Sequence, residues 1–237
     1  MDDTIGRRFA VGSGLFTGFA GIVALGLALV AVPVAGAFCS TGCVPYPYLG
    51  TAARYPQDFA WHPPAILFVF GYLALMLAIH QQAPAPRRIL SQAGVYLAVI
   101  ATAVLAIDYY VQFAVVPISL QSGETNGLPL LIQYNGHGLF IALEELGYLT
   151  MSASLAAASL AISGEGRARA AVRQLFRAPV VVAVLGLIWV TAAFGLDRQD
   201  RFEIPILAAC WLTLIAGSFL LAAAWRRQRR EPANLLD

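Results

Sequence analysis

The sequence predicts an all-α integral membrane protein. Its single domain is a bundle of six transmembrane helices, and both termini of the chain are expected in the cytoplasm. Hydrophobic residues make up 59% of the 237 residues and charged residues only 12%, whereas a typical soluble domain is roughly 25% charged. The apolar residues form long runs separated by short polar stretches, which indicates successive spans rather than one soluble core. Arginines concentrate on one side of these runs, and this asymmetry predicts the orientation.

The six apolar runs each contain at least the roughly 17 residues that a helix needs to cross ~30 Å of hydrocarbon. Pro63, Pro179 and Pro205 fall near the start of three runs, where the missing backbone donor costs a helix least. The predicted spans are residues 9–37, 63–80, 94–117, 138–162, 179–196 and 204–225.

The first run also has features of a secretory signal peptide. Two arginines precede it, and Ala35, Gly36 and Ala37 form a small-residue cleavage site. However, the run is longer than the 7–15 apolar residues of an ordinary signal. Gly14 and Gly18 also have a spacing that suits close helix packing in a membrane. We therefore favour a retained helix and keep cleavage as the alternative.

The arginines predict which loops lie outside the membrane. If the spans alternate in direction, twelve of the fifteen basic residues, all arginines, lie on one side and three on the other. Because cytoplasmic loops carry the excess of basic residues, loops 38–61, 119–136 and 197–203 are expected outside. We expect a multi-pass protein of the cell membrane, specifically the bacterial inner membrane, with membrane lipid as a partner. Homo-oligomerisation stays open, and nothing in the sequence supports binding to nucleic acid.

Carboxyl groups within the third and fourth spans are the most informative residues for function. A carboxyl at such depth costs at least ~2.5–3.5 kcal/mol on insertion, so it rarely faces lipid. Asp108 lies nine residues before Pro117, while Glu144 and Glu145 lie eight and nine residues after Gly136 on the antiparallel neighbour. All three are therefore expected about 12–14 Å deep at helical rise, facing the interior of the bundle.

Helical spacing predicts which of these polar residues share a face. His137, Glu144 and Tyr148 are seven and four residues apart and form one stripe. Glu145 is rotated by about 100° from Glu144, so it flanks the same cavity or meets another helix. Further candidates for lining a small-molecule pocket of this kind are Gln112, which shares a face with Asp108, and Tyr109, Asn135, Trp189 and Trp211.

The leading functional hypothesis is acid–base chemistry on a lipophilic molecule taken from the bilayer, such as isomerisation or cyclisation of an isoprenoid. Glu144 is the expected proton donor and Asp108 its partner. Glu145 is a further catalytic candidate, and His137 and Tyr148 are expected to orient the reacting groups. The alternatives are a proton-coupled transporter of a small solute, a non-catalytic membrane subunit or regulator, or carboxyls that only hydrogen-bond two helices together.

The sequence predicts no cofactor and no metal site. His62 and His80 lie at opposite ends of one predicted helix, about 27 Å apart, so they cannot ligate one haem iron. The seven-residue spacing of His137 and Glu144 is not a recognised metal-ligand motif. Cys39 and Cys43 fall outside the membrane in the predicted topology, where a local disulfide can persist.

Overall fold

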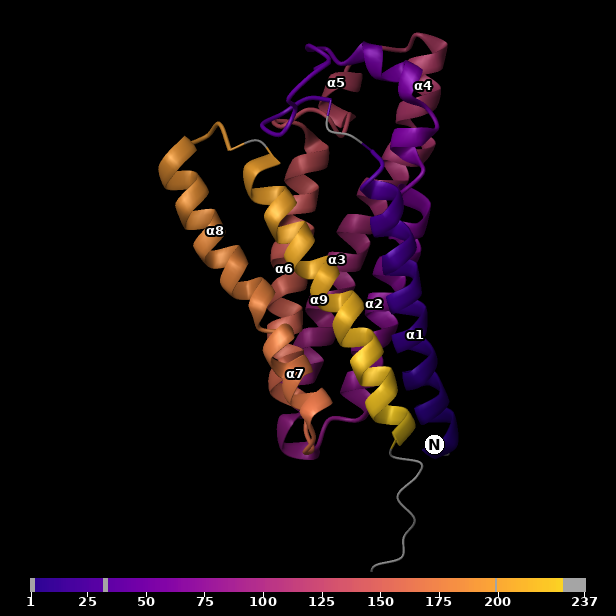
Figure 1. Cartoon of the computed structure of the whole chain (residues 1–237), viewed down its shortest axis with the longest axis vertical. Helices are drawn as coiled ribbons and strands as arrows, with labels where there is room; N and C mark the ends of the chain where they lie inside the picture. The colour runs from indigo at the N-terminus through magenta and orange to yellow at the C-terminus, as the bar shows by residue number, and fades with distance from the viewer. Residues whose placement is uncertain (1–2, 32–33, 199, 228–237) are drawn as a thin grey trace, which may run out of the picture.

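The chain folds into helices and connecting loops. The computed structural model describes residues 3–31, 34–198 and 200–227, and these residues form no strand (Figure 1). Six helical segments are long and apolar enough to cross a membrane, so the predicted all-helical fold with six candidate spans is confirmed. The helices of these segments are α1 (Asp3–Ala28), α2 (His62–Gln81), α3 (Arg88–Ala114), α6 (Leu139–Ala161), α8 (Ala178–Phe194) and α9 (Asp200–Arg227). The shorter elements are η1 (Leu49–Arg54), η2 (Gln57–Phe59), η3 (Ala85–Arg87), α4 (Val116–Ser122), α5 (Leu128–Leu131) and α7 (Arg167–Leu175).

Five of the long helices pack around a common interior. Helix α1 packs on α2 and α9, α3 packs on α2 and α6, and α6 also contacts α9. Helix α8 contacts α6 and α9 from outside this group and leans away from the bundle toward its upper end (Figure 1). Its side chains Leu185, Ile188 and Trp189 are more than 60% exposed. A helix that is apolar all round and mostly exposed is the kind that faces lipid.

The two ends of the bundle differ in charge. Helix α1 begins and α9 ends at the same end of the bundle, next to α7 (Figure 1), and we call this the basic end. Arginines in α1, η3, the start of α3, α7 and the last turn of α9 lie there. The opposite end carries α4 and α5 (Figure 1), together with Arg54, Arg198 and Arg201. We call it the loop end. This segregation is the observation on which the expected orientation rests.

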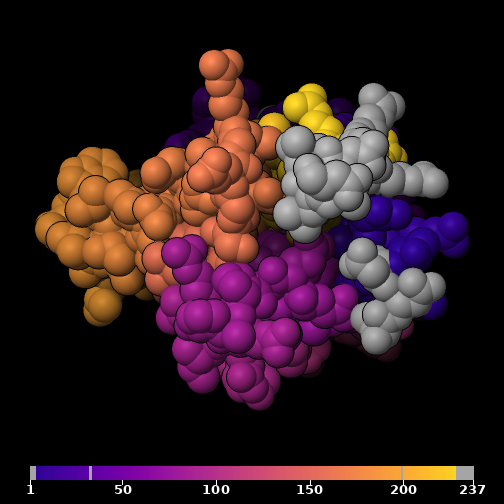
Figure 2. Space-filling model, turned by 90° about the horizontal axis from the view of Figure 1, so that it is seen from below, coloured from indigo at the N-terminus to yellow at the C-terminus, as the bar shows by residue number. Residues whose placement is uncertain are grey.

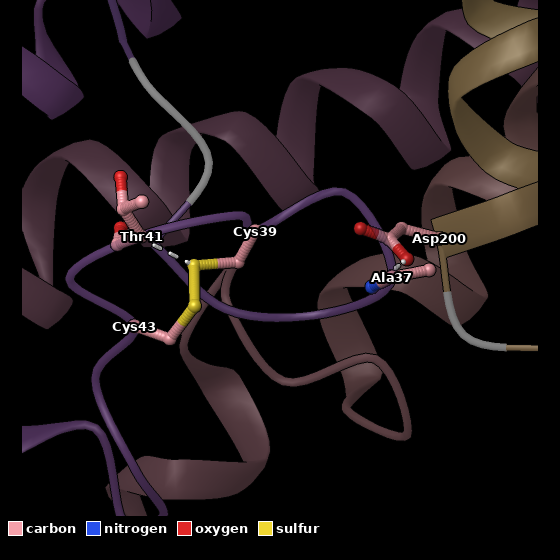
Figure 3. The surroundings of a disulfide bond; sticks show 5 residues. All are labelled: Ala37, Cys39, Thr41, Cys43 and Asp200. Carbon is pink, nitrogen blue, oxygen red and sulfur yellow. Dashed lines mark hydrogen bonds between the residues drawn. A yellow bond between two sulfur atoms is a disulfide. The ribbon is translucent and has the colours of Figure 1, made fainter.

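Helix α1 ends nine residues before the predicted end of the first span. Beyond it, Gly36 has a φ of 77°, a left-handed conformation that glycine adopts without the cost of a Cβ atom. A Cβ atom on Gly36 would lie 2.5 Å from Oδ2 of Asp200, and the amide of Ala37 donates to Oδ1 of Asp200 at 2.9 Å (Figure 3). The first turn of α9 therefore holds this segment in a loop. Figure 3 also shows the disulfide between Cys39 and Cys43 in the same loop.

Glycines allow α1 to approach α9 closely. A Cβ atom on Gly14 would lie 2.8 Å from the carbonyl oxygen of Ser218, and one on Gly18 would lie 2.6 Å from the ring of Phe219. Atoms this close would overlap, so a side chain at either position would push the helices apart. The Gly14 and Gly18 pair thus makes α1 an integral wall of the bundle.

A buried ion pair holds the loop layer, which consists of η1, η2, α4, α5 and the loops that join them. Asp58 is fully buried and accepts hydrogen bonds from the Arg54 guanidinium and the Tyr134 hydroxyl. The hydrogen bond with Asp58 raises the pKa of Arg54, and burial raises the pKa of Tyr134. Arg54 therefore stays charged and Tyr134 stays a neutral donor. Residues far apart in sequence are joined in this way above the bundle.

We expect Asp58→Asn to lower the free energy of unfolding by about 2–3 kcal/mol, because it leaves the part-buried Arg54 without its carboxylate. Thermal unfolding in mild detergent measures the loss, and limited proteolysis of loop 38–61 should become faster. Glu124→Gln is the matched control, since Glu124 is exposed in the same layer. Equal stability of the two variants would show that the ion pair does not hold the layer.

A candidate intramembrane carboxyl site

Helices α3, α6 and α9 bring their buried polar side chains together. Asp108, Glu144 and Glu203, one from each helix, are 2–4% exposed. A glycine makes this approach possible, because a Cβ atom on Gly147 of α6 would lie 2.5 Å from the Leu105 side chain of α3. The aromatic members of the cluster, all fully buried, are Tyr109, Tyr148 and Trp211.

Hydrogen bonds run in one direction through the aromatic residues. The indole Nε1 of Trp211 donates to the Tyr148 hydroxyl at 2.6 Å, and the Tyr109 hydroxyl donates to Oε1 of Glu144 at 2.8 Å. The two tyrosine hydroxyls also bond each other. Because the single proton of Tyr109 points to Glu144, Tyr148 must be the donor to Tyr109. Every donor in this chain therefore points toward Glu144, which is its acceptor end.

The three carboxyl groups interact with one another. The carboxyl of Glu144 lies close enough to those of Glu203 and Asp108 to interact with both. Among the described residues, no basic side chain forms a salt bridge with any of the three. Two carboxyls can hydrogen-bond only if one carries a proton, and several like charges in a low-dielectric interior repel strongly. We therefore expect the Glu144 and Glu203 pair to share a proton.

Two buried polar atoms beside this chain have no hydrogen-bond partner among the described residues, Oδ2 of Asp108 and Nε2 of His62. The Nδ1 atom of His62 lies 3.1 Å from the carbonyl oxygen of Phe59. Since a carbonyl only accepts, Nδ1 carries the proton and Nε2 has a free lone pair. The His62 ring lies 6.0 Å from that of Tyr109. Two proton acceptors thus flank the hydroxyl chain.

Aromatic rings form the walls of the site. Trp61 lies 5.2 Å from Tyr109 and 6.2 Å from Trp211 between ring centroids, and it also contacts Phe140. Trp189 does not join them, because its helix α8 lies outside the bundle core and its side chain is 65% exposed. The aromatic wall opposite Trp211 is supplied by Trp61 instead.

Charged residues at the loop end lie at the rim of the site. Arg198 donates to Oε2 of Glu145 at 3.0 Å, and Nε2 of His137 lies 3.2 Å from Oδ1 of Asp197. The His137 side chain is 63% exposed. It therefore does not join Glu144 in the interior, although helical spacing predicted that the two share one face. A cavity of about 260 Å³ is lined by His137, Glu145 and Arg198. Glu145, the residue after Glu144 on α6, lines this cavity together with residues of the loop end.

The two candidate amides hold loops. Gln112 donates to the carbonyl of Leu131 and accepts from the amide of Gln133 at 3.1 Å. Asn135 donates to the carbonyl of Pro129 at 2.9 Å and accepts from the amide of His137. Both side-chain amides therefore form hydrogen bonds with the backbone around α5. These bonds position that segment, and they use the polar groups that could otherwise have lined the carboxyl cluster.

Glu203, His62 and Trp61 were not among the sequence-predicted site residues. Glu203 directly precedes the predicted sixth span, whereas α9 begins at Asp200 and buries it. Its eight-residue spacing from Trp211 puts both on one face of a helix, and that signal was present in the sequence. No spacing rule links His62 and Trp61 to the third and fourth spans, so only the tertiary structure reveals their position.

The fold and the site together define a chain of six candidate membrane spans with a buried cluster of carboxyls and tyrosines at the meeting point of α3, α6 and α9. The chain matches no protein-family model, no curated protein and no solved structure.

Proposed function

We propose that this chain is a multi-pass membrane enzyme that moves protons on a lipophilic molecule, as in an isomerisation or cyclisation. The observation that carries the proposal is the buried Glu144 and Glu203 pair at the acceptor end of an oriented hydrogen-bond chain. Such a pair holds a proton at neutral pH without a cation nearby, and a held proton is what a general acid needs. The Oδ2 atom of Asp108, which has no hydrogen-bond partner in the described part of the chain, supplies a further acceptor.

In this scheme the carboxyl pair gives its proton to one carbon of a double bond, and Asp108 takes a proton from a neighbouring carbon. The substrate gains one proton and loses another, so the proton count balances and no oxidant or reductant is required. The rings of Trp61, Trp211 and Tyr109 surround the site. Their negative faces stabilise positive charge that develops on carbon.

Access from the bilayer suits a lipophilic substrate. Helix α8 presents apolar side chains outward and leaves the bundle at the loop end (Figure 1). The cavity lined by His137, Glu145 and Arg198 lies at the same end. The Glu145 and Arg198 pair at its wall offers a charged anchor for a polar head group. The substrate would enter with its apolar part toward the carboxyl cluster.

Mass spectrometry of molecules that copurify in mild detergent tests this function. We expect a lipophilic molecule with wild-type protein and at least a tenfold lower amount with Asp108→Asn, because the substitution removes the carboxylate that faces it. Glu124→Gln is the control, since Glu124 lies in the exposed loop layer. Equal recovery from the two variants would contradict a ligand at this site, and recovery of a stoichiometric protein would favour a subunit or regulator.

Proton-coupled transport is the second candidate, because hydrogen bonds of one direction also suit a proton relay. Purified protein in liposomes distinguishes the two functions. Solute-dependent proton flux that Glu144→Gln abolishes supports transport, whereas conversion of a lipophilic molecule without flux supports the enzyme.

A further inference from the structure

A groove with arginines at its rim lies at the basic end, far along the bundle from the carboxyl site. It has a volume of about 890 Å³ and is lined by the first half of α1 and the last turns of α9. Figure 2 views the molecule from this end, with α1 in indigo and α9 in yellow. Each helix contributes two adjacent arginines to the groove, Arg7 and Arg8 from α1 and Arg226 and Arg227 from α9.

The charges of these arginines are not balanced within the described part of the chain. Arg54 and Arg198 each form a salt bridge with a carboxylate, but none of the four groove arginines does so with a carboxylate that the structure describes. Four guanidinium groups around one groove repel one another and attract an anion. Guanidinium groups bind phosphate through paired hydrogen bonds, which makes a phosphate group the best-fitting anion.

The floor of the groove is apolar and open. Val11, Leu15 and Phe219 contribute apolar side chains to its lining beside the arginines. Gly12 contributes no side chain, and a Cβ atom built there would meet nothing within 4 Å. An inorganic phosphate would leave this floor exposed. A molecule with a phosphate head and an acyl chain would cover both parts of the groove.

A second basic cavity adjoins the first across α9. It has a volume of about 380 Å³, lies between α7 and α9, and includes Arg167. Ala223 and Arg227 line both cavities. The basic surface is therefore continuous around the last turns of α9, and it lies on the side expected to face the cytoplasm, whose leaflet carries anionic lipid.

We propose that the groove between α1 and α9 binds an anionic phospholipid. The arginines bind the phosphate of the head group, and one acyl chain lies along Val11, Leu15 and Phe219. The bound lipid covers the groove alongside the contact between the first and last helices of the bundle. This site is independent of the carboxyl cluster and of the enzyme function proposed for it.

Native mass spectrometry of the full chain in mild detergent tests the site, with phosphatidylglycerol as the anionic probe and phosphatidylcholine as the zwitterionic one. We expect phosphatidylglycerol to bind at least tenfold more tightly than phosphatidylcholine. The double variant R7Q/R226Q removes one arginine from each wall. It should weaken phosphatidylglycerol binding about 25-fold at low ionic strength, at about fivefold for each arginine.

The double variant R87Q/R88Q is the matched control, because it removes two charges from the basic end outside the groove. Its affinity should stay within about twofold of wild type, since screening weakens charges at a distance. Gly12→Leu fills the floor without changing charge, and we expect it to weaken phosphatidylglycerol binding about tenfold while the fold stays intact.

Equal binding of the two lipids, or equal loss in R7Q/R226Q and R87Q/R88Q, would overturn the proposal. Unchanged binding in Gly12→Leu together with displacement of the lipid by millimolar inorganic phosphate would also overturn it, in favour of a simple phosphate site. None of these variants touches Asp108, Glu144 or Glu203, so the outcome leaves the acid–base function to be judged separately.

Discussion

Glu144→Gln should abolish the infrared carbonyl band of a protonated carboxyl in the purified protein at neutral pH. The glutamine side chain keeps the size of the original and still accepts the hydrogen bond from Tyr109. It cannot share a proton with Glu203, however, because an amide has no ionisable proton and its nitrogen can only donate a hydrogen bond to that group. The band that the shared proton produces in wild-type protein is therefore expected to disappear.

The same variant should reduce any acid–base turnover of a copurifying molecule about 10²–10⁴-fold, the usual contribution of a general acid. Glu145→Gln is the matched control on the next residue, because Glu145 pairs with Arg198 at the rim. We expect it to keep the protonated-carboxyl band and most of the activity. A band that persists unchanged in Glu144→Gln would place the proton elsewhere, most simply on Asp108, and would remove the basis of the proposed mechanism.

Composition and helical spacing were sufficient to predict the all-helical fold with six candidate spans and to bring some residues of the candidate site together. The cost of a carboxyl in lipid placed Asp108 and Glu144 in the interior of the bundle, and the structure buries both. A four-residue spacing put Tyr148 on the face of Glu144, where it joins the hydrogen-bond chain. These inferences succeed because the helix fixes the direction of each side chain along one span.

The remaining site residues depend on how separate helices are placed. Trp189 and Trp211 were both candidates for lining the pocket, yet only Trp211 lies in the core because α8 packs outside it. Glu203 was assigned to a loop because hydropathy places the start of a span at the first apolar residue, whereas the helix starts earlier. The hydrogen bond from Tyr134 to Asp58 joins residues 76 positions apart. Neither the expected depth of a residue nor its spacing along one helix predicts a contact between separate segments of the chain.

The first helix shows what the sequence can predict and what it cannot. Its apolar run and the small residues before position 38 resemble a signal peptide, and composition cannot separate a cleaved segment from a retained span. The glycine spacing predicted close packing, and the structure supplies the partner, α9, with Ser218 facing Gly14. If α1 is retained, a substitution that disturbs its contact with α9 should destabilise the protein, whereas the same substitution should have no effect if α1 is cleaved.

Gly14→Leu should lower the free energy of unfolding by about 3 kcal/mol and the melting temperature in detergent by about 6–12 °C. The physical reason is overpacking, since even the Cβ atom would lie 2.8 Å from a backbone oxygen that cannot rotate away. The helices α1 and α9 must then separate. Gly14→Ala should show a smaller loss, because it adds only the first atom of that side chain.

Gly26→Leu is the control for the same substitution on the same helix. Gly26 is exposed, and a Cβ atom there would meet nothing within 4 Å, so the change should leave the melting temperature within about 2 °C of wild type. Intrinsic tryptophan fluorescence follows unfolding in all these variants. If α1 were cleaved as a signal peptide, Gly14→Leu and Gly26→Leu would both melt like wild type. A loss confined to Gly14→Leu requires that the helix stays in place and packs on α9.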